Sequence, residues 1–165
     1  MKYTIIILMQ LVVLLVQGCT NDYTEDLSGG YFYRDEGPDT KDILGGSSGD
    51  IYSKVISYDY NDDFIIVAQR PNFKEYRESV AFDMRCDDTL TYPQNSIGEI
   101  KSENVADSIL KHDQYYINIF SRFVNYWIIS HKNRQMYGPY SKEEFQRKRI
   151  ELSVPDNLQI HVQKE

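Results

Sequence analysis

Short runs of aromatic and β-branched residues, separated by Gly, Pro, Asn and Asp, dominate the apolar pattern after residue 28. Such runs are typical of strands, and the residues between them favour turns. The clearest pair is 51–60 and 64–68, which flank an Asn-Asp turn and predict an antiparallel hairpin. The second run does not alternate, so we expect its strand to be covered on both faces. Further strands are predicted at 28–34, 43–44, 79–84, 124–131, 136–137 and 158–162.

Two segments have the helical period of about 3.6 residues instead. In 103–121 the apolar residues recur on one face, and Ser102 is placed to cap the helix N-terminus. The segment 141–152 begins Ser-Lys-Glu-Glu, which has the spacing of a capping box. Residues 71–101 are mixed and polar, and we expect most of them to form a loop excursion.

These elements predict one α+β domain over residues 28–165, with an antiparallel sheet of about four to six strands and two helices on one of its faces. The two periodic helical segments favour this fold over a pure β-sandwich. The length after residue 28 suits a single hydrophobic core and is short for two.

The N-terminus has a different pattern: Lys2 precedes a nearly unbroken apolar run over 3–16. This arrangement is typical of a secretory signal, and roughly 21 Å of helix is short of the roughly 30 Å hydrocarbon core. The residues that follow resemble the lipobox of bacterial lipoproteins, Leu15-Val16-Gln17-Gly18-Cys19. The resemblance implies a signal peptide over 1–18 and a diacylglyceryl group on Cys19. The alternative is an ordinary signal peptide with an accidental cysteine.

Residues 19–27 are polar and without period, so we expect a lipidated flexible tether. Residue 20 is Thr rather than Asp, so the usual inner-membrane retention signal is absent and the outer membrane of a diderm cell envelope is the expected location. Asp22, Glu25 and Asp26 resemble the surface-export signal of some bacterial lipoproteins, and they also suit a solvated tether. The sequence leaves both interpretations open.

Composition narrows the choice of partners. The formal net charge is −7, which argues against nucleic acid and against electrostatic binding to anionic lipid. We therefore expect contact with the membrane through the lipid on Cys19, and an unknown envelope protein or ligand as the partner. With Cys19 acylated, Cys86 is the only other cysteine; we expect a packed side chain, with intermolecular pairing or reactivity as alternatives.

Motifs that suggest catalysis or metal binding are incomplete. Gly45-Gly46-Ser47-Ser48-Gly49 matches the pattern of a serine nucleophile elbow, but the predicted element after it is a strand, not a helix. The calcium-loop pattern that begins at Asp59 lacks its required Gly and its final Glu. The three histidines are scattered along the chain. We therefore expect no metal site and no cofactor, and a non-catalytic protein rather than an enzyme.

A family resemblance rests on three groups of residues. They are Asp62-Asp63-Phe64-Ile65-Ile66-Val67-Ala68-Gln69, then Tyr126-Trp127-Ile128-Ile129-Ser130-His131-Lys132, and then Tyr137-Gly138-Pro139-Tyr140-Ser141 with Glu144-Phe145. Together they resemble a family of small uncharacterised bacterial lipoproteins, domain of unknown function 3997. The likeness covers roughly 28–69 and 124–160 and leaves out 71–121. It implies no activity, substrate or catalytic residue.

The function expected from these features is a membrane-anchored binding or interaction module of the cell envelope. The alternatives are a small envelope hydrolase, built on scattered carboxylates or Ser47, and an immunity-type inhibitor protein. Basic and aromatic residues stand out in the excursion of an otherwise acidic chain, and Arg and Tyr often anchor interfaces. The predicted partner-binding residues are Arg70, Phe73, Lys74, Tyr76, Arg77, Arg85 and Tyr92.

Overall fold

The computed structural model describes residues 22–162, so the expected signal peptide and Cys19 lie outside the described residues. No helix within 22–162 is long and apolar enough to cross a membrane. The elements in chain order are β1 (Tyr23–Asp26), β2 (Tyr31–Asp35), β3 (Lys41–Gly45), β4 (Val55–Tyr60), β5 (Phe64–Gln69), α2 (Phe73–Asp87), α3 (Ser96–His112), α4 (Gln114–Phe120), β6 (Asn125–Ser130), β7 (Gln135–Tyr140) and α5 (Lys142–Glu151).

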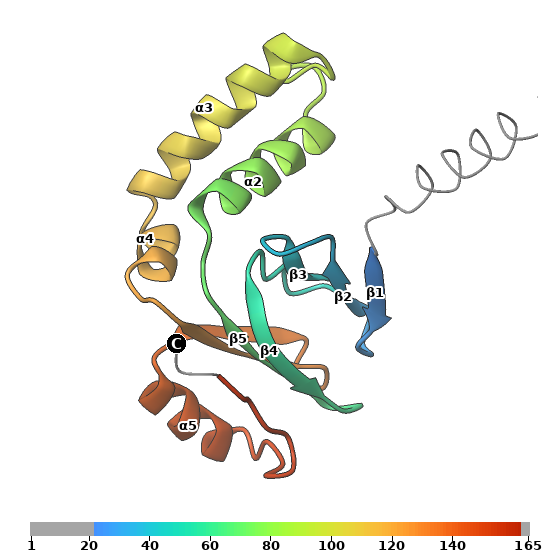
Figure 1. Cartoon of the computed structure of the whole chain (residues 1–165), viewed down its shortest axis with the longest axis vertical. Helices are drawn as coiled ribbons and strands as arrows, with labels where there is room; N and C mark the ends of the chain where they lie inside the picture. Colours follow the sequence, from blue (N-terminus) through green and yellow to red (C-terminus); the bar gives the residue numbers. More distant parts are fainter. Residues whose placement is uncertain (1–21, 163–165) are drawn as a thin grey trace, which may run out of the picture.

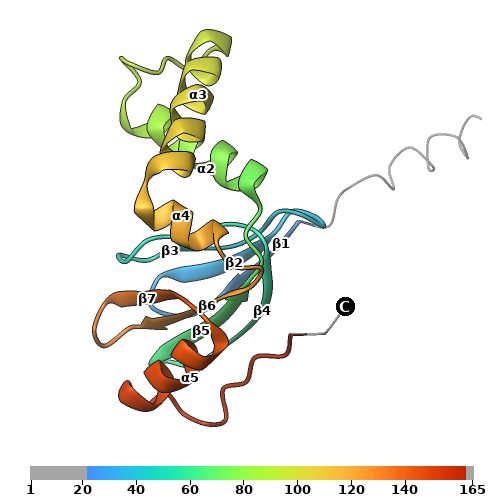
Figure 2. The same cartoon turned by 90° about the vertical axis from the view of Figure 1, so that its left-hand side faces the viewer.

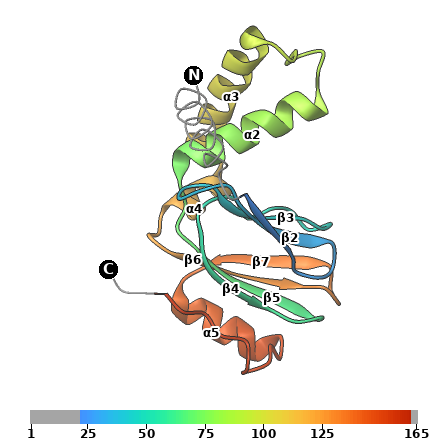
Figure 3. The same ribbon diagram turned by 45° about the vertical axis from the view of Figure 1, so that its right-hand side comes forward.

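The fold is α+β, as the sequence predicts, but the strands form two antiparallel sheets rather than one. A three-stranded sheet has the order β1-β2-β3, and a four-stranded sheet has the order β4-β5-β6-β7. The predicted hairpin is confirmed as β4 and β5, with Tyr60 paired to Ile65. Figure 3 shows the two sheets as successive layers, with α5 beneath the four-stranded sheet.

The four-stranded sheet is covered on both faces, which explains the lack of alternation in β5. Ile65 and Val67 face a core that includes residues of the three-stranded sheet, α2 and α4. Ile66 and Ala68 face the opposite way and belong to the cluster of Phe145 from α5. The helices therefore cover different faces, and the expectation of two helices on one face is wrong. The second sheet occupies much of the face that the sequence alone left uncovered.

The predicted loop excursion is instead a helical hairpin. Helix α2 covers the segment that included a predicted strand at 79–84, and its N-terminus is capped by Asn72. The predicted helix 103–121 begins earlier, at Ser96, and is broken at Asp113, whose side chain caps α4. Figures 1 and 2 show α2 and α3 projecting side by side from the sheets.

Two chain ends also differ from the prediction. Residues 23–26, expected in the flexible tether, form β1, which pairs with β2. Glu25 on this strand also accepts hydrogen bonds from Tyr58 at 2.7 Å and Tyr60 at 2.9 Å, both on β4. Residues 158–162 form no strand. These residues nevertheless lie beside β4, because the backbone N–H of Gln159 donates to the Asp59 carboxylate at 2.8 Å. The predicted helix at 141–152 is confirmed as α5, with the capping box in place.

Candidate functional site

A cleft of about 660 Å³ lies between the three-stranded sheet and the α2–α3 hairpin. We name it the acidic cleft, because seven acidic and two basic residues line it. Its lining residues are Arg34, Glu36, Thr40, Leu44, Asp50, Tyr52, Glu75, Glu78, Ser79, Phe82, Asp83, Arg85, Glu99 and Glu103. Segments far apart in the sequence thus contribute to one surface.

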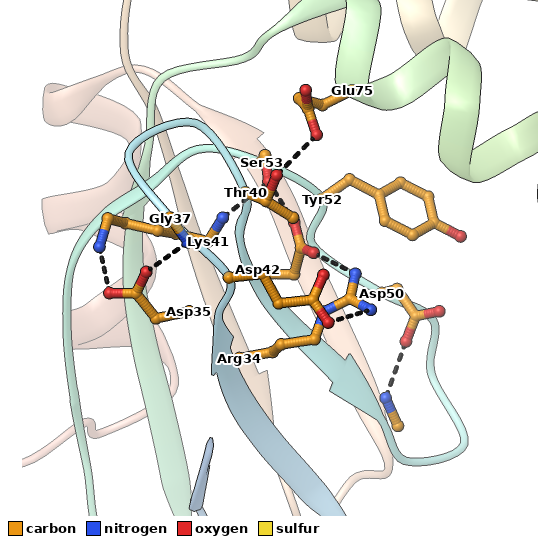
Figure 4. Close-up of polar contacts among 12 residues, drawn as sticks. Arg34, Asp35, Gly37, Thr40, Lys41, Asp42, Asp50, Tyr52, Ser53 and Glu75 are labelled. Carbon is orange, nitrogen blue, oxygen red and sulfur yellow. Dashed lines mark hydrogen bonds and ion pairs between the residues drawn. The ribbon is translucent and has the colours of Figure 1, made fainter. Parts of the chain in front are cut away.

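A polar network around Asp42 stabilises the floor of the acidic cleft (Figure 4). Asp42 itself is only 1% exposed. The Arg34 guanidinium donates to its carboxylate at 2.6 Å, and the Ser53 hydroxyl donates to the other oxygen. The backbone N–H of Lys41 donates in turn to Ser53 Oγ at 2.9 Å. A buried carboxylate with this set of donors is fully engaged, so we assign Asp42 to the fold.

Two side-chain hydrogen bonds connect the sheet side of the acidic cleft to α2. The Thr40 hydroxyl donates to the Glu75 carboxylate at 3.0 Å, and the Tyr52 hydroxyl donates to Asp83 (Figure 4 shows the first). Burial raises the pKa of Tyr52, and its hydrogen bond to Asp83 raises this pKa further. Tyr52 is therefore a donor and not a base at neutral pH.

Burial and neighbouring negative charge act together on Asp50 in the acidic cleft. Burial raises the pKa of this carboxyl above its ordinary value, and the charges of Asp83 and Asp42 raise it further. The Arg34 guanidinium and the hydrogen bond from the Gly45 backbone act in the opposite direction. A positively charged group that enters the cleft would relieve the repulsion between these carboxylates.

An apolar side chain stands among the charges. Phe82 is 56% exposed although it lies on a helix that packs against the core. The Arg85 guanidinium lies 5.9 Å from the centre of its ring. An exposed aromatic ring in a hollow surface suits the apolar part of a bound chain.

Two of the acidic residues of the cleft form ion pairs within the chain. Glu78 pairs with Lys74 at 3.4 Å and Glu103 pairs with Arg77 at 3.3 Å, so part of the charge is compensated locally. Within residues 22–162, no group of three His, Cys, Asp or Glu side chains is arranged to hold a metal ion.

The predicted partner-binding residues do not form one surface. Tyr76 is 2% exposed and belongs to the core, so a partner cannot reach it. The ring of Phe73 packs against Phe120, with 5.2 Å between their centres. The Arg70 guanidinium lies 4.5 Å from the centre of the Phe123 ring. These three predicted residues therefore join α2 and the preceding turn to the rest of the domain.

The other four lie along the α2–α3 hairpin. Arg77 pairs with α3 as described, Arg85 donates to the buried Ser102 hydroxyl at 2.8 Å, and the Lys101 ammonium lies 5.3 Å from the Tyr92 ring. Lys74 is mostly exposed, with 71% of its side chain accessible. Of the seven residues, Arg85 alone lines the acidic cleft. Whether the exposed ones bind a partner stays a prediction.

The sequence analysis did not identify the carboxylates of the acidic cleft, because they come from several separate segments of the chain. The available signal was the helical spacing of acids on facing helices, such as Glu75 and Glu78 on α2 and Glu99 and Glu103 on α3. The sequence predicts a loop over 71–101, so the helical spacing of the acids in that range does not stand out, whereas Glu103 lies in the predicted helix 103–121. Cys86 was expected to be packed, but it is an exposed free cysteine on α2, so that expectation is wrong.

Comparison with known proteins gives one match. Residues 97–164 match the profile of a family described as a protein of unknown function, DUF3997. No curated protein and no solved structure matches the chain. The matched region includes β6, β7 and α5, where the resemblance was expected, and also α3 and α4, which the expected likeness left out. The first part of the expected likeness, 28–69, lies outside the match. Over residues 97–164, the chain is therefore similar to the DUF3997 family of proteins of unknown function.

Proposed function

We propose that the protein is a lipid-anchored, non-catalytic binding module of the cell envelope, and that its acidic cleft binds a basic segment of a partner. The anchor in this proposal is the lipobox cysteine, Cys19, which lies outside the described residues. The binding surface is the hollow between the three-stranded sheet and the helical hairpin.

The observation that carries the proposal is the combination of shape, charge and an exposed ring in the acidic cleft. Its volume of about 660 Å³ is in the range of ligand-binding clefts. Seven acidic residues against two basic ones favour a cationic partner, because opposite charges steer association and disfavour acidic competitors. Phe82 offers an apolar contact beside them.

A binding role agrees better with the side-chain contacts than catalysis does. Glu75, Glu78, Asp83 and Glu103 each have a hydroxyl, ammonium or guanidinium partner from the chain itself. Carboxylates that already hold such partners serve the local structure of the cleft and are not set apart as general acids or bases. The raised pKa of Asp50 is the exception, and its cause is burial together with neighbouring negative charge.

The binding proposal is tested with the full chain in a neutral detergent and a synthetic peptide of alternating Arg and Leu, compared with an acidic peptide of equal length. We expect saturable binding of the basic peptide that weakens as salt is added. The double variant Glu78→Lys with Glu99→Lys should weaken it by about tenfold or more. The matched control, Asp62→Lys with Asp156→Lys, makes the same charge change at exposed positions outside the cleft lining.

Two outcomes would contradict the proposal. Equal weakening by the cleft variant and the control would mean that total charge, and not the acidic cleft, attracts the peptide. Equal binding of the acidic peptide would remove the charge argument. The anchor is tested separately by labelled palmitate, which we expect the wild-type protein to incorporate and the Cys19→Ala variant to lack.

A further inference from the structure

A second pocket, separate from the acidic cleft, lies where two glycine-rich turns meet the turn after β6. Its volume is about 490 Å³, and it shares no lining residue with the acidic cleft. The polar side chains that matter for its chemistry are Ser47, Ser48, His131 and Arg134. We name it the donor pocket. It includes the serine of the motif that resembles a nucleophile elbow.

The shape of the donor pocket depends on two glycines beneath two rings. A Cβ atom on Gly29 would lie 2.1 Å from His131 Nδ1, and a Cβ atom on Gly46 would lie 2.2 Å from the Tyr31 ring. Both glycines have positive φ, +61° and +68°, which other residues rarely adopt. A backbone hydrogen bond of 3.0 Å from Gly46 to Gly30 joins the two turns.

Strained backbone is concentrated beside this pocket. Ser28 has φ 71° and Arg134 has φ 49°, although neither is glycine. Such conformations cost free energy and often occur where a binding or catalytic site requires them. Both residues adjoin His131: Ser28 Oγ lies 3.1 Å from its Nε2, and the Arg134 backbone N–H donates to its carbonyl at 3.3 Å.

The imidazole of His131 is held neutral. Burial lowers its pKa, while the nearby charges of Asp63 and Asp62 act against that shift. Neither aspartate lines the donor pocket. Ser28 does not line it either, and its hydroxyl also donates to the Asn61 carbonyl at 3.1 Å. Ser28 is thus a residue that orients His131 rather than a nucleophile that faces the pocket.

The charge of the donor pocket is opposite to that of the acidic cleft. No carboxylate lines it, although the chain as a whole has a formal charge of −7. Arg134 forms no ion pair with any carboxylate among residues 22–162. Its guanidinium and the hydroxyls of Ser47 and Ser48 are hydrogen-bond donors. Donors of this kind are what carboxylates and phosphates bind in proteins.

We propose that the donor pocket binds an oxyanion, the carboxylate or phosphate group of a small ligand. Arg134 supplies the charge, and the two serine hydroxyls supply neutral hydrogen bonds. The neutral His131 ring, fixed over Gly29, forms one wall. This site differs from the acidic cleft in position and in the charge that it selects, so it can be tested independently of the cleft.

The test is calorimetric titration of the full chain in neutral detergent with inorganic phosphate and with acetate, at an ionic strength held constant with chloride. We expect saturable binding of at least one of the two, and the ion that binds defines the ligand class. Arg134→Asn should weaken that binding about tenfold or more, because it removes the charge while Asn still tolerates positive φ. Ser47→Ala, in an exposed loop, should weaken it less.

The matched control is Lys132→Ala, which removes a positive charge from the same turn but not from the pocket lining. It should bind the anion as the wild-type protein does. The proposal is overturned if neither ion gives saturable binding at tens of millimolar, or if Lys132→Ala weakens binding as much as Arg134→Asn. If Arg134→Asn lowers the unfolding temperature strongly, Ser47→Ala decides the outcome, since unchanged binding in that variant would also refute the pocket.

Discussion

Replacing Gln69 with Met removes a fully buried hydrogen-bonding hub while nearly conserving side-chain volume. Gln69 is 0% exposed at the end of β5. Its amide nitrogen donates to the Tyr52 carbonyl at 2.6 Å and to the Tyr76 hydroxyl, and its amide oxygen accepts from Trp127 Nε1 at 3.0 Å. Asn125 adds a longer contact at 3.4 Å. The hub therefore joins β5, β6, α2 and the segment before β4.

The cost of Gln69→Met follows from the groups that it leaves without a partner. The Tyr52 carbonyl, the Tyr76 hydroxyl and the Trp127 N–H would each lose a hydrogen bond in the interior, at about 1–3 kcal/mol apiece. Asn125 keeps its hydrogen bond to the Ile119 carbonyl at 2.8 Å and should contribute little. With partial relaxation we expect a total loss of about 3–5 kcal/mol, a large part of the roughly 5–15 kcal/mol typical of a domain.

The assay is urea unfolding of the full chain in detergent, followed by the fluorescence of Trp127, the only tryptophan in the sequence. Gln146→Met, at an exposed position on α5, is the matched control and should change the free energy of unfolding by less than about 0.5 kcal/mol. A loss below about 1 kcal/mol for Gln69→Met would refute the reasoning, because the buried donors and acceptors would then have found other partners.

Three further predictions concern titration and backbone packing. Glu25→Gln should lower stability near neutral pH, because hydrogen bonds, chiefly from Tyr58, lower the pKa of Glu25 in the folded state. The stabilisation that this shift represents is present above the ordinary pKa of 4.5 and is lost as the pH falls. The unfolding curves of the variant and the wild type should therefore converge in acid. Asp50→Asn should have the opposite effect, because the pKa of Asp50 is raised in the folded state and its ionisation therefore opposes folding as the pH rises. The melting temperature of the variant should be higher than that of the wild type at neutral pH and equal to it in acid. Gly98→Ala should lower the melting temperature, since its Cβ atom would lie 1.9 Å from the Pro93 carbonyl oxygen; an unchanged melting temperature would contradict the tight turn between α2 and α3.

The central sheet and the last helix were predictable because their signals are local and strong. Five of the six residues of β5 are buried, which agrees with the unbroken apolar run in its sequence. At the start of α5, Ser141 and Glu144 form both reciprocal hydrogen bonds of a capping box, at 3.2 and 2.7 Å. In each case neighbouring residues determine the element without help from distant ones.

Helix α2 and strand β1 were missed because distant contacts stabilise them. Only Tyr76, Val80 and Ala81 are buried on α2, which is too sparse a pattern for a helix to be recognised. Strand β1 is polar, and it is held by its backbone pairing with β2 and by the hydrogen bonds of Glu25 rather than by apolar burial. The acidic cleft was missed for the same reason, since α2 supplies one of its sides and neither periodicity nor composition marks that helix.

If the protein is anchored through Cys19 as we propose, the pairing of β1 limits how far the domain can lie from the membrane. Three residues separate Cys19 from Tyr23, the first residue of β1, and four peptide steps span at most about 14 Å. If Cys19 carries lipid as we propose, this short connection keeps the three-stranded sheet close to the lipid headgroups. Releasing β1 up to Leu27 would double the reach to roughly 27 Å. On that proposal, the edge strand β1 holds part of the connection to Cys19 within the fold, where Tyr58 and Tyr60 of β4 donate to Glu25.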